Sequence, residues 1–578
     1  MYQTSDEYKE AMKKPIRNHS YMIVTLGVIN QDAQRSASVS DQDKYIDFSN
    51  FSSVFNESWN GNHYATYEKD FFKVDGSMVF LPDDVSDCQK NGLISERLFS
   101  GEFKMKFTFG CGKVDIKGLT IQFVDNYPTK FSISTDSGAV TQYENDSAFF
   151  ETDTVFENTS YIEITITEMK YSNGRVRLNY VKFGIGLEFD NEDIKSAESK
   201  STLSVIDDDL PQIDFSVTVC NNDQVFDVDN PESVINFFEP GQALNVSYGY
   251  ELDDSSIEWI KAHSIYLSEW KADNKQAVIS AVDRFQIMND SYYKGKYYDN
   301  GISLYDLAES VLLDAGIESD EYAITDYLKE IKVKNPIPNV GHKEALQIIA
   351  NAGMCVLGYD RDGKIQIYQD SNSDTGYRIE FDDLFEHPVG NQLEKIKELR
   401  IARTRLTKST TLEELMSDTF SYDGSNITYF FESPCYGYTV SVEASGSATI
   451  VSSGSYYIEI SIDGVNTGEE ITVLVKGYRY NESSSYYAVS LNNRGSIKEW
   501  QNPIVSDLSH AKKIAEWLSG YYSSAVEYDL DFRGEPALDA GDTISQENKY
   551  NDNLNVVIEE IQLKFEQSIR SNLKTRRK

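Results

Sequence analysis

The feature that most restricts the fold of this chain is a series of short segments in which polar and apolar residues alternate. Between residues 103 and 189 the segments are FKMKFTFG, GLTIQFV, KFSIS, YIEITITEM and RLNYVKFGIGLEF. Alternation places apolar side chains on one face of a strand, and short strands separated by turns are typical of a β-sandwich. The sequence therefore predicts a chain that is mainly β, with a minor α+β part.

The composition agrees with a strand-rich fold. The 578 residues include 38 Tyr and 29 Phe but only 12 Pro, and aromatic side chains pack well on pleated surfaces. A chain of this length fits about three to five domains. With 54 Lys and Arg against 93 Asp and Glu, the net charge is -39. This charge repels phosphate backbones and anionic lipid surfaces, so nonspecific binding to nucleic acid is not expected.

The segment GYDRDGKIQIYQD, residues 358–370, has acidic residues at alternate positions before a glycine, as a calcium loop would. With Asp360 and Asp362 as the third and fifth ligand positions, however, the first position is a glycine and the closing carboxylate is Gln369. Neither can supply the carboxylate that the site needs. An apolar run precedes the loop and an alternating run follows it, so Asp362-Gly363 predicts a β-hairpin instead.

The sequence shows no set of residues that predicts catalysis, a cofactor or a metal. The five cysteines are scattered and never at C-x-x-C spacing, which favours buried free thiols: Cys88, Cys111, Cys220, Cys355 and Cys435. No H-E-x-x-H or G-x-S-x-G motif occurs. No run reaches the roughly 20 apolar residues of a membrane span, and the start of the chain lacks a secretory core. We expect a soluble protein that is made in a cytoplasm.

The stretch RGEPALDAGD carries three carboxylates, Glu535, Asp539 and Asp542, which could supply the acid and base of a glycoside hydrolase. The Gly, Pro and Ala residues between them are typical of turns between strands. We therefore favour a structural loop.

Three segments have the apolar spacing of amphipathic helices: 301–317, 342–353 and 507–522. In the first, Ser303 with Asp306 predicts a capping box and Gly316 predicts the helix end. We expect the apolar faces of all three to lie in the core.

The segment from 45 to 187 resembles a discoidin-like, carbohydrate-binding jelly roll. The likeness lies in the order GLTIQF, DNYPTKFSIS, VFENTSYIEITITEMK and LNYVKFGIG, with Asn173-Gly174 predicted as a type I′ hairpin turn. The resemblance implies that loop aromatics at one end bind a sugar face, and the candidate residues are Trp59, Tyr64, Tyr67 and Tyr127. The alternative is that these rings belong to the core or to an interface of a purely structural sandwich.

Most of the chain also resembles prophage tail-tip proteins of Gram-positive bacteria. The runs that carry this likeness follow one another in the family's order: LPQIDFSVTVCNNDQVFDVDN, HSIYLSEWKADNKQAVISAVDRF, GISLYDLAESVLLDAGI, NPIPNVGHKEALQIIANAGMCVLGYDRDGKI, QNPIVSDLSHAKKIAEWLSGYY and YDLDFRGEPALDAGDTI. The opening MYQTSDEYKEAMKKPIR and the segment YATYEKDFFKVDGSMVFLP also resemble the family.

The resemblance implies a baseplate hub that caps a tail tube and is built from tube-like β-barrels. The expected parts are an N-terminal arm and hub segment (1–44), the jelly-roll sandwich (45–187), a first hub barrel (188–300), an αβ hub domain (301–372) and a second hub barrel (373–578) with a β-rich insertion at about 410–500. Such a hub is a virion or phage-like particle component, assembled in the host bacterial cytoplasm. Phages and bacteriocin-like tailocins both fit this resemblance.

The implied partners are further copies of the chain in a homotrimer ring, tail-tube and distal tail proteins, and receptor-binding or tail-fibre proteins. A host-cell glycan is a further partner through the sandwich, and DNA would pass only as transient cargo. The alternative is a secreted or surface carbohydrate-active protein in which the sandwich targets a catalytic domain. The missing secretory segment and the missing acid/base pair both favour the non-enzymatic hub.

Overall fold

The structure is a computed structural model of residues 1–578. It describes the whole chain except residues 41–43, 47–48, 52, 57–62, 65–67, 69–77, 80–91, 125, 207–208, 223, 231–232, 370–373, 444–445 and 525. Strands far outnumber helices among the described residues, so the prediction of a mainly β chain with a minor α+β part is confirmed.

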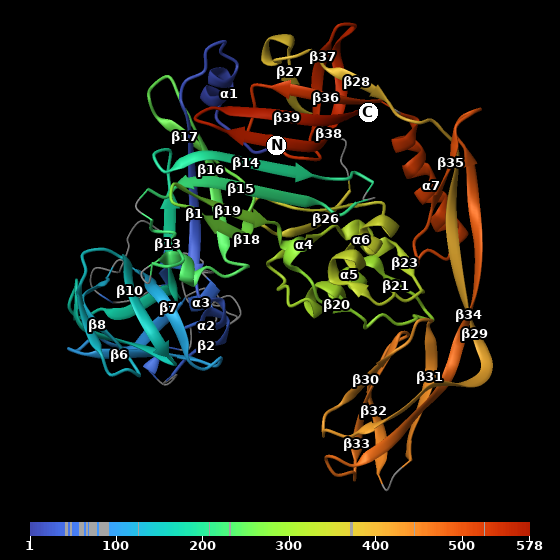
Figure 1. Cartoon of the computed structure of the whole chain (residues 1–578), viewed down its shortest axis with the longest axis horizontal. Helices are drawn as coiled ribbons and strands as arrows, with labels where there is room; N and C mark the ends of the chain where they lie inside the picture. Colours follow the sequence, from blue (N-terminus) through green and yellow to red (C-terminus); the bar gives the residue numbers. More distant parts are fainter. Residues whose placement is uncertain are drawn as a thin grey trace.

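One large sheet of 14 strands joins segments from both ends of the chain (Figure 1). Its main path runs through β13 (Gly184–Phe189), β1 (Ser20–Ile29), β16 (Ala243–Glu251), β18 (Ile265–Ala272), β19 (Gln276–Val282), β15 (Gln212–Cys220), β14 (Ile194–Thr202), β38 (Asn551–Phe565), β39 (Ile569–Arg577), β36 (Val526–Phe532) and β28 (Val389–Gln392). Three further strands pair beside this path: β17 (Ile257–Lys261) with β16, and β37 (Thr543–Asn548) with β38 and with β27 (Asp374–Ile379).

The link between the two halves of this sheet is the antiparallel pair β14 and β38, with Ala197 opposite Phe565 and Thr202 opposite Glu560. Strands from the two predicted barrels therefore belong to one hydrogen-bonded sheet. Its strands alternate as the sequence predicts, and β1 buries every second side chain. Their apolar faces meet in one continuous core that includes Val217, Ile279 and Val556.

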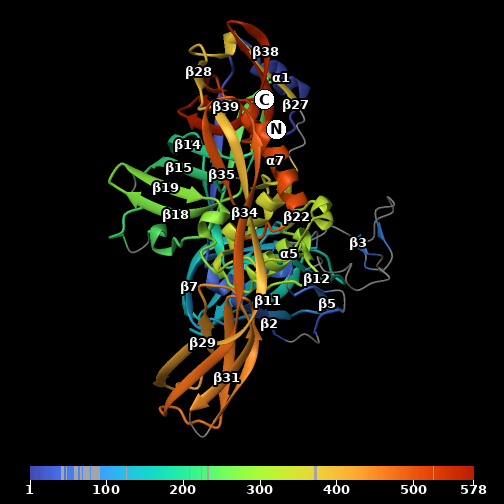
Figure 2. The ribbon, with the colours of Figure 1, turned by 90° about the vertical axis from the view of Figure 1, so that its right-hand side faces the viewer.

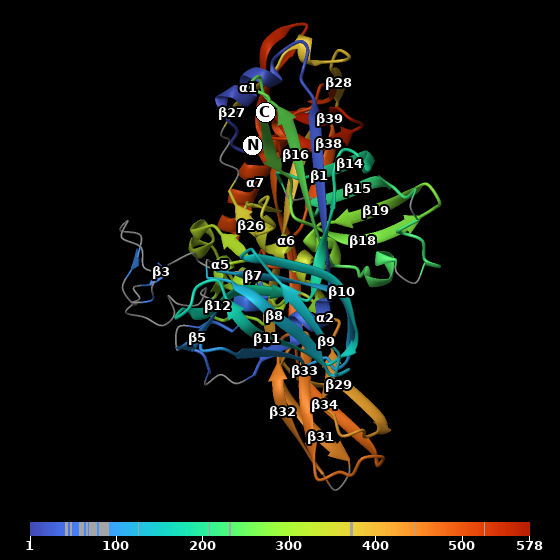
Figure 3. The same ribbon diagram turned by 90° about the vertical axis from the view of Figure 1, so that its left-hand side faces the viewer.

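A β-sandwich packs beside one end of the large sheet (Figure 3). One of its sheets has the order β10 (Phe149–Thr159), β7 (Val114–Phe123), β12 (Arg175–Lys182) and β5 (Leu93–Leu98). The other has the order β2 (Ala37–Val39), β6 (Phe103–Phe109), β11 (Tyr161–Met169), β8 (Pro128–Thr135) and β9 (Val140–Glu144). The inward side chains of both sheets form a separate core around Phe107, Ile121, Phe131 and Ile164.

The predicted hairpin at Asn173-Gly174 is wrong. Strand β11 pairs with β6 and β8, whereas β12 pairs with β7 and β5 in the opposite sheet. Asn173 has a φ of 65°, but Gly174 is not in the left-handed region that a type I′ turn requires at both positions. The turn therefore carries the chain from one layer to the other, and alternation within each strand does not reveal this difference in partner.

The sandwich is inserted between two neighbouring strands of the large sheet. Ile29 at the end of β1 lies opposite Gly184 at the start of β13, and the Asn30 amide donates to the Phe183 carbonyl at 3.0 Å. The sandwich thus includes β2, before the expected start at residue 45, and ends before β13, whereas the predicted segment ran to 187. Its short remaining elements are α2 (Gln31–Ser36), α3 (Ser53–Asn56), β3 (His63–Tyr64) and β4 (Met78–Val79).

The αβ part contains the predicted helices and hairpin. Helices α5 (Leu304–Asp314) and α6 (His342–Ala352) are confirmed, and the Ser303 hydroxyl caps α5 at the Asp306 amide. The predicted hairpin is formed by β25 (Val356–Tyr359) and β26 (Ile365–Tyr368), and β22 (Tyr322–Ile324) extends it. Shorter elements nearby are α4 (Arg284–Ile287), β20 (Ser291–Tyr292), β21 (Ile302–Ser303), η4 (Asp326–Glu330), β23 (Lys332–Val333) and β24 (Val340–Gly341), whereas η3 (Val234–Phe237) packs on the core of the large sheet.

A long two-stranded ribbon projects from the rest of the molecule and ends in a small β unit (Figure 2). Its strands are β29 (Ile396–Ser421) and β34 (Glu470–Ser490), flanked by β31 (Cys435–Glu443) and β35 (Ser496–Trp500). The distal unit adds β30 (Ile427–Phe430), β33 (Tyr457–Asp463) and β32 (Ser447–Ser453), with its own core around Ile460 and Val473. Predicted helix α7 (Leu508–Ser523) is confirmed, and α1 (Asp6–Met12) and η5 (Phe381–Asp383) complete the elements.

The thiols do not all match the expectation of burial. Cys355 and Cys435 are buried, but Cys111 is exposed and Cys220 is partly exposed. Cys88 lies outside the described residues. Among the residues that the structure describes, no helix has both the length and the apolar character that crossing a membrane requires.

The insertion geometry predicts that the sandwich can be removed. We expect a variant with residues 31–182 replaced by Asn-Gly, and with Phe183→Ser, to remain soluble and folded. The reason is that Asn30 and Phe183 already form the hydrogen-bonded end of an antiparallel pair, which a two-residue turn can close. Circular dichroism, thermal melting and size-exclusion chromatography would check this, and aggregation of the excised chain would place the sandwich within the folding core.

Candidate functional site

The structure describes only part of the predicted sugar-binding set. Trp59 and Tyr67 lie outside the described residues, and only the backbone of Tyr64 is described, in β3. Tyr127 is partly buried against the sandwich core, and the Lys170 ammonium lies 4.7 Å from its ring centre. Tyr127 is therefore the one ring of the four whose side chain the structure describes, and the carbohydrate site stays a prediction.

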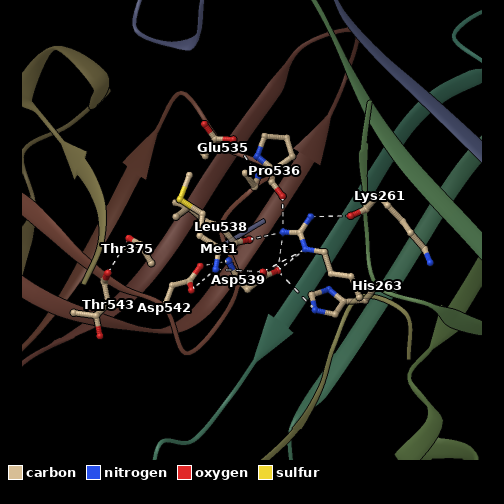
Figure 4. A network of polar contacts seen from close by, with 12 residues as sticks. Met1, Lys261, His263, Thr375, Glu535, Pro536, Leu538, Asp539, Asp542 and Thr543 are labelled. Atoms are coloured by element: carbon tan, nitrogen blue, oxygen red, sulfur yellow. Dashed lines mark hydrogen bonds and ion pairs between the residues drawn. The ribbon is translucent and has the colours of Figure 1, made fainter. Parts of the chain in front are cut away.

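A different set of polar residues surrounds an open pocket of about 1100 Å³ between the N-terminal segment, the β25–β26 hairpin and the large sheet. Figure 4 shows that His263 points toward the same region as Asp539 and Asp542, which share one turn in a distant segment. His263 follows β17, Asp539 and Asp542 precede β37, and Arg361 comes from the tip of the hairpin. Segments that are distant in the sequence thus meet here.

Arg361 is the centre of this network. Its Nη2 donates to Oδ1 of Asp539 at 2.7 Å and its Nε donates to the same oxygen at 3.1 Å. The guanidinium also donates to the carbonyl oxygens of Lys261 at 2.7 Å and Pro536 at 2.9 Å. Only 11% of the Arg361 side chain is exposed. Because the charge is nearly removed from water, each of these acceptors matters to its stability.

The two aspartates of the hairpin tip are used in other ways. Asp360 caps its own turn by accepting from the amides of Asp362 and Lys364, while Asp362 lies 2.5 Å from the Lys261 ammonium. Gly363 has a φ of 83°, which suits glycine. Asp360 therefore stabilises the hairpin tip, and Asp362 binds the neighbouring strand β17 through Lys261. No group of three or more possible metal-ligating side chains occurs among the described residues.

The three carboxylates of RGEPALDAGD contact residues from the N-terminal segment. Glu535 is buried and accepts from the Tyr8 hydroxyl at 2.7 Å and from the Ala537 amide at 3.0 Å. Burial raises the pKa of Glu535 and also that of Asp542, whose Oδ1 lies 2.5 Å from the Met1 amino nitrogen. The Met1 amino nitrogen also lies 3.8 Å from Oδ2 of Asp539, so the N-terminal segment contacts all three carboxylates, which agrees with the structural loop that we favoured.

His263 lies at the edge of the network, with its Nε2 atom 3.7 Å from Oδ1 of Asp539. Burial lowers the pKa of His263, and the Arg361 charge acts in the same direction, whereas the Asp539 charge opposes it. The imidazole is therefore held in its neutral form more strongly than a free histidine would be. No serine or cysteine nucleophile is hydrogen-bonded to it among the described residues.

The arrangement can act mechanically as a clamp. Arg361 ties the hairpin of the αβ part to both the β17 end and the 535–542 turn of the large sheet. The sequence predicts the hairpin tip around Arg361 but gives no signal for the role of the Arg361 side chain. Nothing in a single sequence connects it with Asp539, because the two residues belong to loops that are far apart in the chain.

No protein-family model and no curated protein matches the chain. The structure is similar to the 43 kDa tail protein of prophage MuSo2 from Shewanella oneidensis, at 10% identity over 78% of this chain and 97% of that chain, with a TM-score of 0.35. It is also similar to a tail protein from Neisseria meningitidis, at 8% identity over 68% and 93% of the two chains, with a TM-score of 0.39. A prophage tail protein from Listeria monocytogenes matches at 9% identity over 67% and 91%, with a TM-score of 0.34. Similarity at this level assigns no activity to the chain.

The clamp predicts a large loss of stability on removal of its central charge. We expect Arg361→Gln to lower the free energy of unfolding by about 2–3 kcal/mol, because Asp539 and two carbonyl oxygens lose a desolvated donor. Lys261→Gln is the matched control, since its pair with Asp362 is largely exposed and should cost under about 1 kcal/mol. Urea unfolding of both variants, and a double-mutant cycle with Asp539→Asn, would measure the difference. Equal losses in the two single variants would contradict the clamp.

His263 predicts a specific response to acid. An unfolded histidine has its usual pKa near 6.5, while the folded pKa of His263 is lower. As pH falls through 6.5, the unfolded state binds more protons than the folded state, so stability decreases. When the pH is lowered from 7.5 to 5.5, we expect the free energy of unfolding to fall less in His263→Gln than in the parent chain. His387→Gln, which changes an exposed histidine, should show the same fall as the parent. Identical pH profiles for the parent and His263→Gln would refute this role.

Proposed function

We propose that the chain is a structural component of the tip of a phage or phage-like tail. The proposal rests on one observation: the runs that resemble tail-tip proteins form the central elements of the fold. The resembling runs include β15, β18, β19 and β36 of the large sheet, together with α5, α6, α7 and the β25–β26 hairpin. These elements build the two largest cores of the molecule.

The segments that depart from a minimal tail-tip protein extend from this body, and among the described residues only the end of the second segment, from Tyr487 to Trp500, packs against the body's core. The sandwich is inserted between β1 and β13, and the β-rich segment near 410–500 belongs to the projecting ribbon and its distal unit. Both have cores of their own. A protein that connects a tube to accessory parts needs a rigid body with units attached at its periphery. The division into a body and two added units therefore supports a structural role without enzymatic activity.

Within this proposal the chain caps the tail tube and holds receptor-binding or wall-penetrating parts, in a particle assembled in the host cytoplasm. The two strand groups on either side of the β14–β38 pair would act as two tube-like units in each copy. Three copies in a ring would then present six units to a six-fold tube, and ring closure is the natural result of a repeated heterologous contact. A net charge of -39 would help DNA to pass without being held.

The ring predicts a trimer. We expect cryo-microscopy of assembled tails to show three copies of the chain around the tail axis, with the large sheet facing the tube and the sandwich at the periphery. A single copy or a pair of copies at the tip would disprove this arrangement. Mass photometry of the purified chain would show whether the ring forms without the tube.

We also propose that the sandwich contacts a host-cell glycan, through Tyr127 and the predicted partners Trp59, Tyr64 and Tyr67. Cell binding should disappear in the sandwich-excised variant and weaken in Tyr127→Ala, while Tyr550→Ala, which removes an exposed ring elsewhere, should leave it unchanged. Equal binding by all variants would leave Tyr127 as a packing residue. The secreted carbohydrate-active protein is the alternative, and release of reducing sugar from host-wall polysaccharide by the purified chain would favour it.

A further inference from the structure

A second cavity, of about 570 Å³, lies where three parts of the molecule meet. Helix α7 supplies one wall, the αβ part supplies another, and β38 with the end of β39 supplies the third. This volume is within the range of pockets that bind small ligands or short peptide segments, and such pockets favour junctions between structural units.

The walls of this pocket combine apolar and aromatic surface. Trp517 and Tyr521 come from α7, Tyr327 and Met354 from the αβ part, and Val557 from β38. Trp and Tyr provide large, rigid contact area at low cost in conformational entropy. This part of the pocket suits an aromatic or aliphatic side chain.

The charged wall of the pocket is entirely basic among the described residues. Arg576, Arg577 and Lys578 line it, and no described Asp or Glu does so. This local excess of positive charge occurs in a chain that carries 93 acidic and 54 basic residues. The charge of this wall is therefore complementary to that of an anionic ligand.

Two guanidinium groups in this wall have unused donors. Arg576 is 9% exposed; its Nη1 donates to the Tyr521 hydroxyl at 2.8 Å and its Nη2 to the Ser524 carbonyl at 3.2 Å, but its buried Nε has no hydrogen-bond partner. Glu527 and Glu559 are each 3.9 Å from Arg576 Nη1, so they balance its charge without reaching Nε. Arg577 has an exposed side chain for which no hydrogen bond or ion pair is found among the described residues. Arg576 Nε is shielded from solvent, so the guanidinium of Arg577 is the group that an incoming carboxylate can reach, and a charge-assisted hydrogen bond there would be strong.

We propose that this pocket binds an acidic, apolar segment of a partner protein, with a carboxylate at Arg577 and a neighbouring apolar side chain against Trp517. The proposal rests on the chemistry of the pocket and does not depend on the tail-tip role. Because the pocket joins α7, the αβ part and the large sheet, an occupant would also brace these three units against one another.

The test uses the full chain and two dipeptides that differ only in charge, N-acetyl-Phe-Asp-amide and N-acetyl-Phe-Asn-amide. We expect titration calorimetry, together with a change in tryptophan fluorescence, to show binding of the Asp peptide at least tenfold tighter than that of the Asn peptide. Raising the salt concentration should weaken binding of the Asp peptide more than binding of the Asn peptide. Equal affinities for the two peptides, or no binding of the Asp peptide at millimolar concentration, would overturn the proposal.

The matched variants are Arg577→Gln and Lys574→Gln. Both remove one exposed cation from β39, but Lys574 does not line the pocket and lies 3.4 Å from Glu527. We expect Arg577→Gln to lower the affinity for the Asp peptide about tenfold and Lys574→Gln to leave this affinity unchanged. The two variants should have equal melting temperatures. Equal loss of affinity in both variants would mean that general surface charge, and not the pocket, attracts the peptide.

Discussion

The pairing of β14 with β38 is the constraint on which the rest of the molecule depends. Residues near 200 and residues near 560 form the same antiparallel ladder, so neither half of the large sheet has a free edge at this point. The apolar faces on both sides then share one core. The Arg361 clamp acts on this joined body, because its acceptors, the Lys261 carbonyl and the Asp539 carboxylate, belong to strand ends from the two halves.

The sequence predicts best those features whose cause is local. The capping hydroxyl of Ser303, the apolar spacing of α6 and the Asp362-Gly363 tip each determine the conformation of neighbouring residues, and all three appear in the structure as predicted. Asn173-Gly174 shows the limit of this reasoning. The residue pair favours a turn, but the choice between joining two strands of one sheet and crossing to the other layer depends on tertiary packing.

The candidate site could not be predicted for a related reason. Arg361 lies among residues that suggested a calcium loop, and its significance comes from acceptors that are about 100 and 178 positions away in the sequence. The carboxylates at 535–542 were identified, and a structural role was favoured for them, but their partners Tyr8 and Arg361 depend on the fold. To predict a long-range ion pair, one must know which two distant residues come together in the fold. A single sequence does not show this.

The place of the sandwich within the β1–β13 connection has a consequence for how the chain folds during synthesis. Strand β1 leaves the ribosome more than 200 residues before its partner β16, and β38 and β39 follow later still. A domain with its own core can fold as soon as it is complete. When the sandwich does so, it brings Ile29 beside Gly184 and so closes a very long loop before the large sheet begins to form. The inserted domain thereby removes much of the entropic barrier to pairing the first strand, and it shortens the time for which an unpaired, apolar strand is open to aggregation.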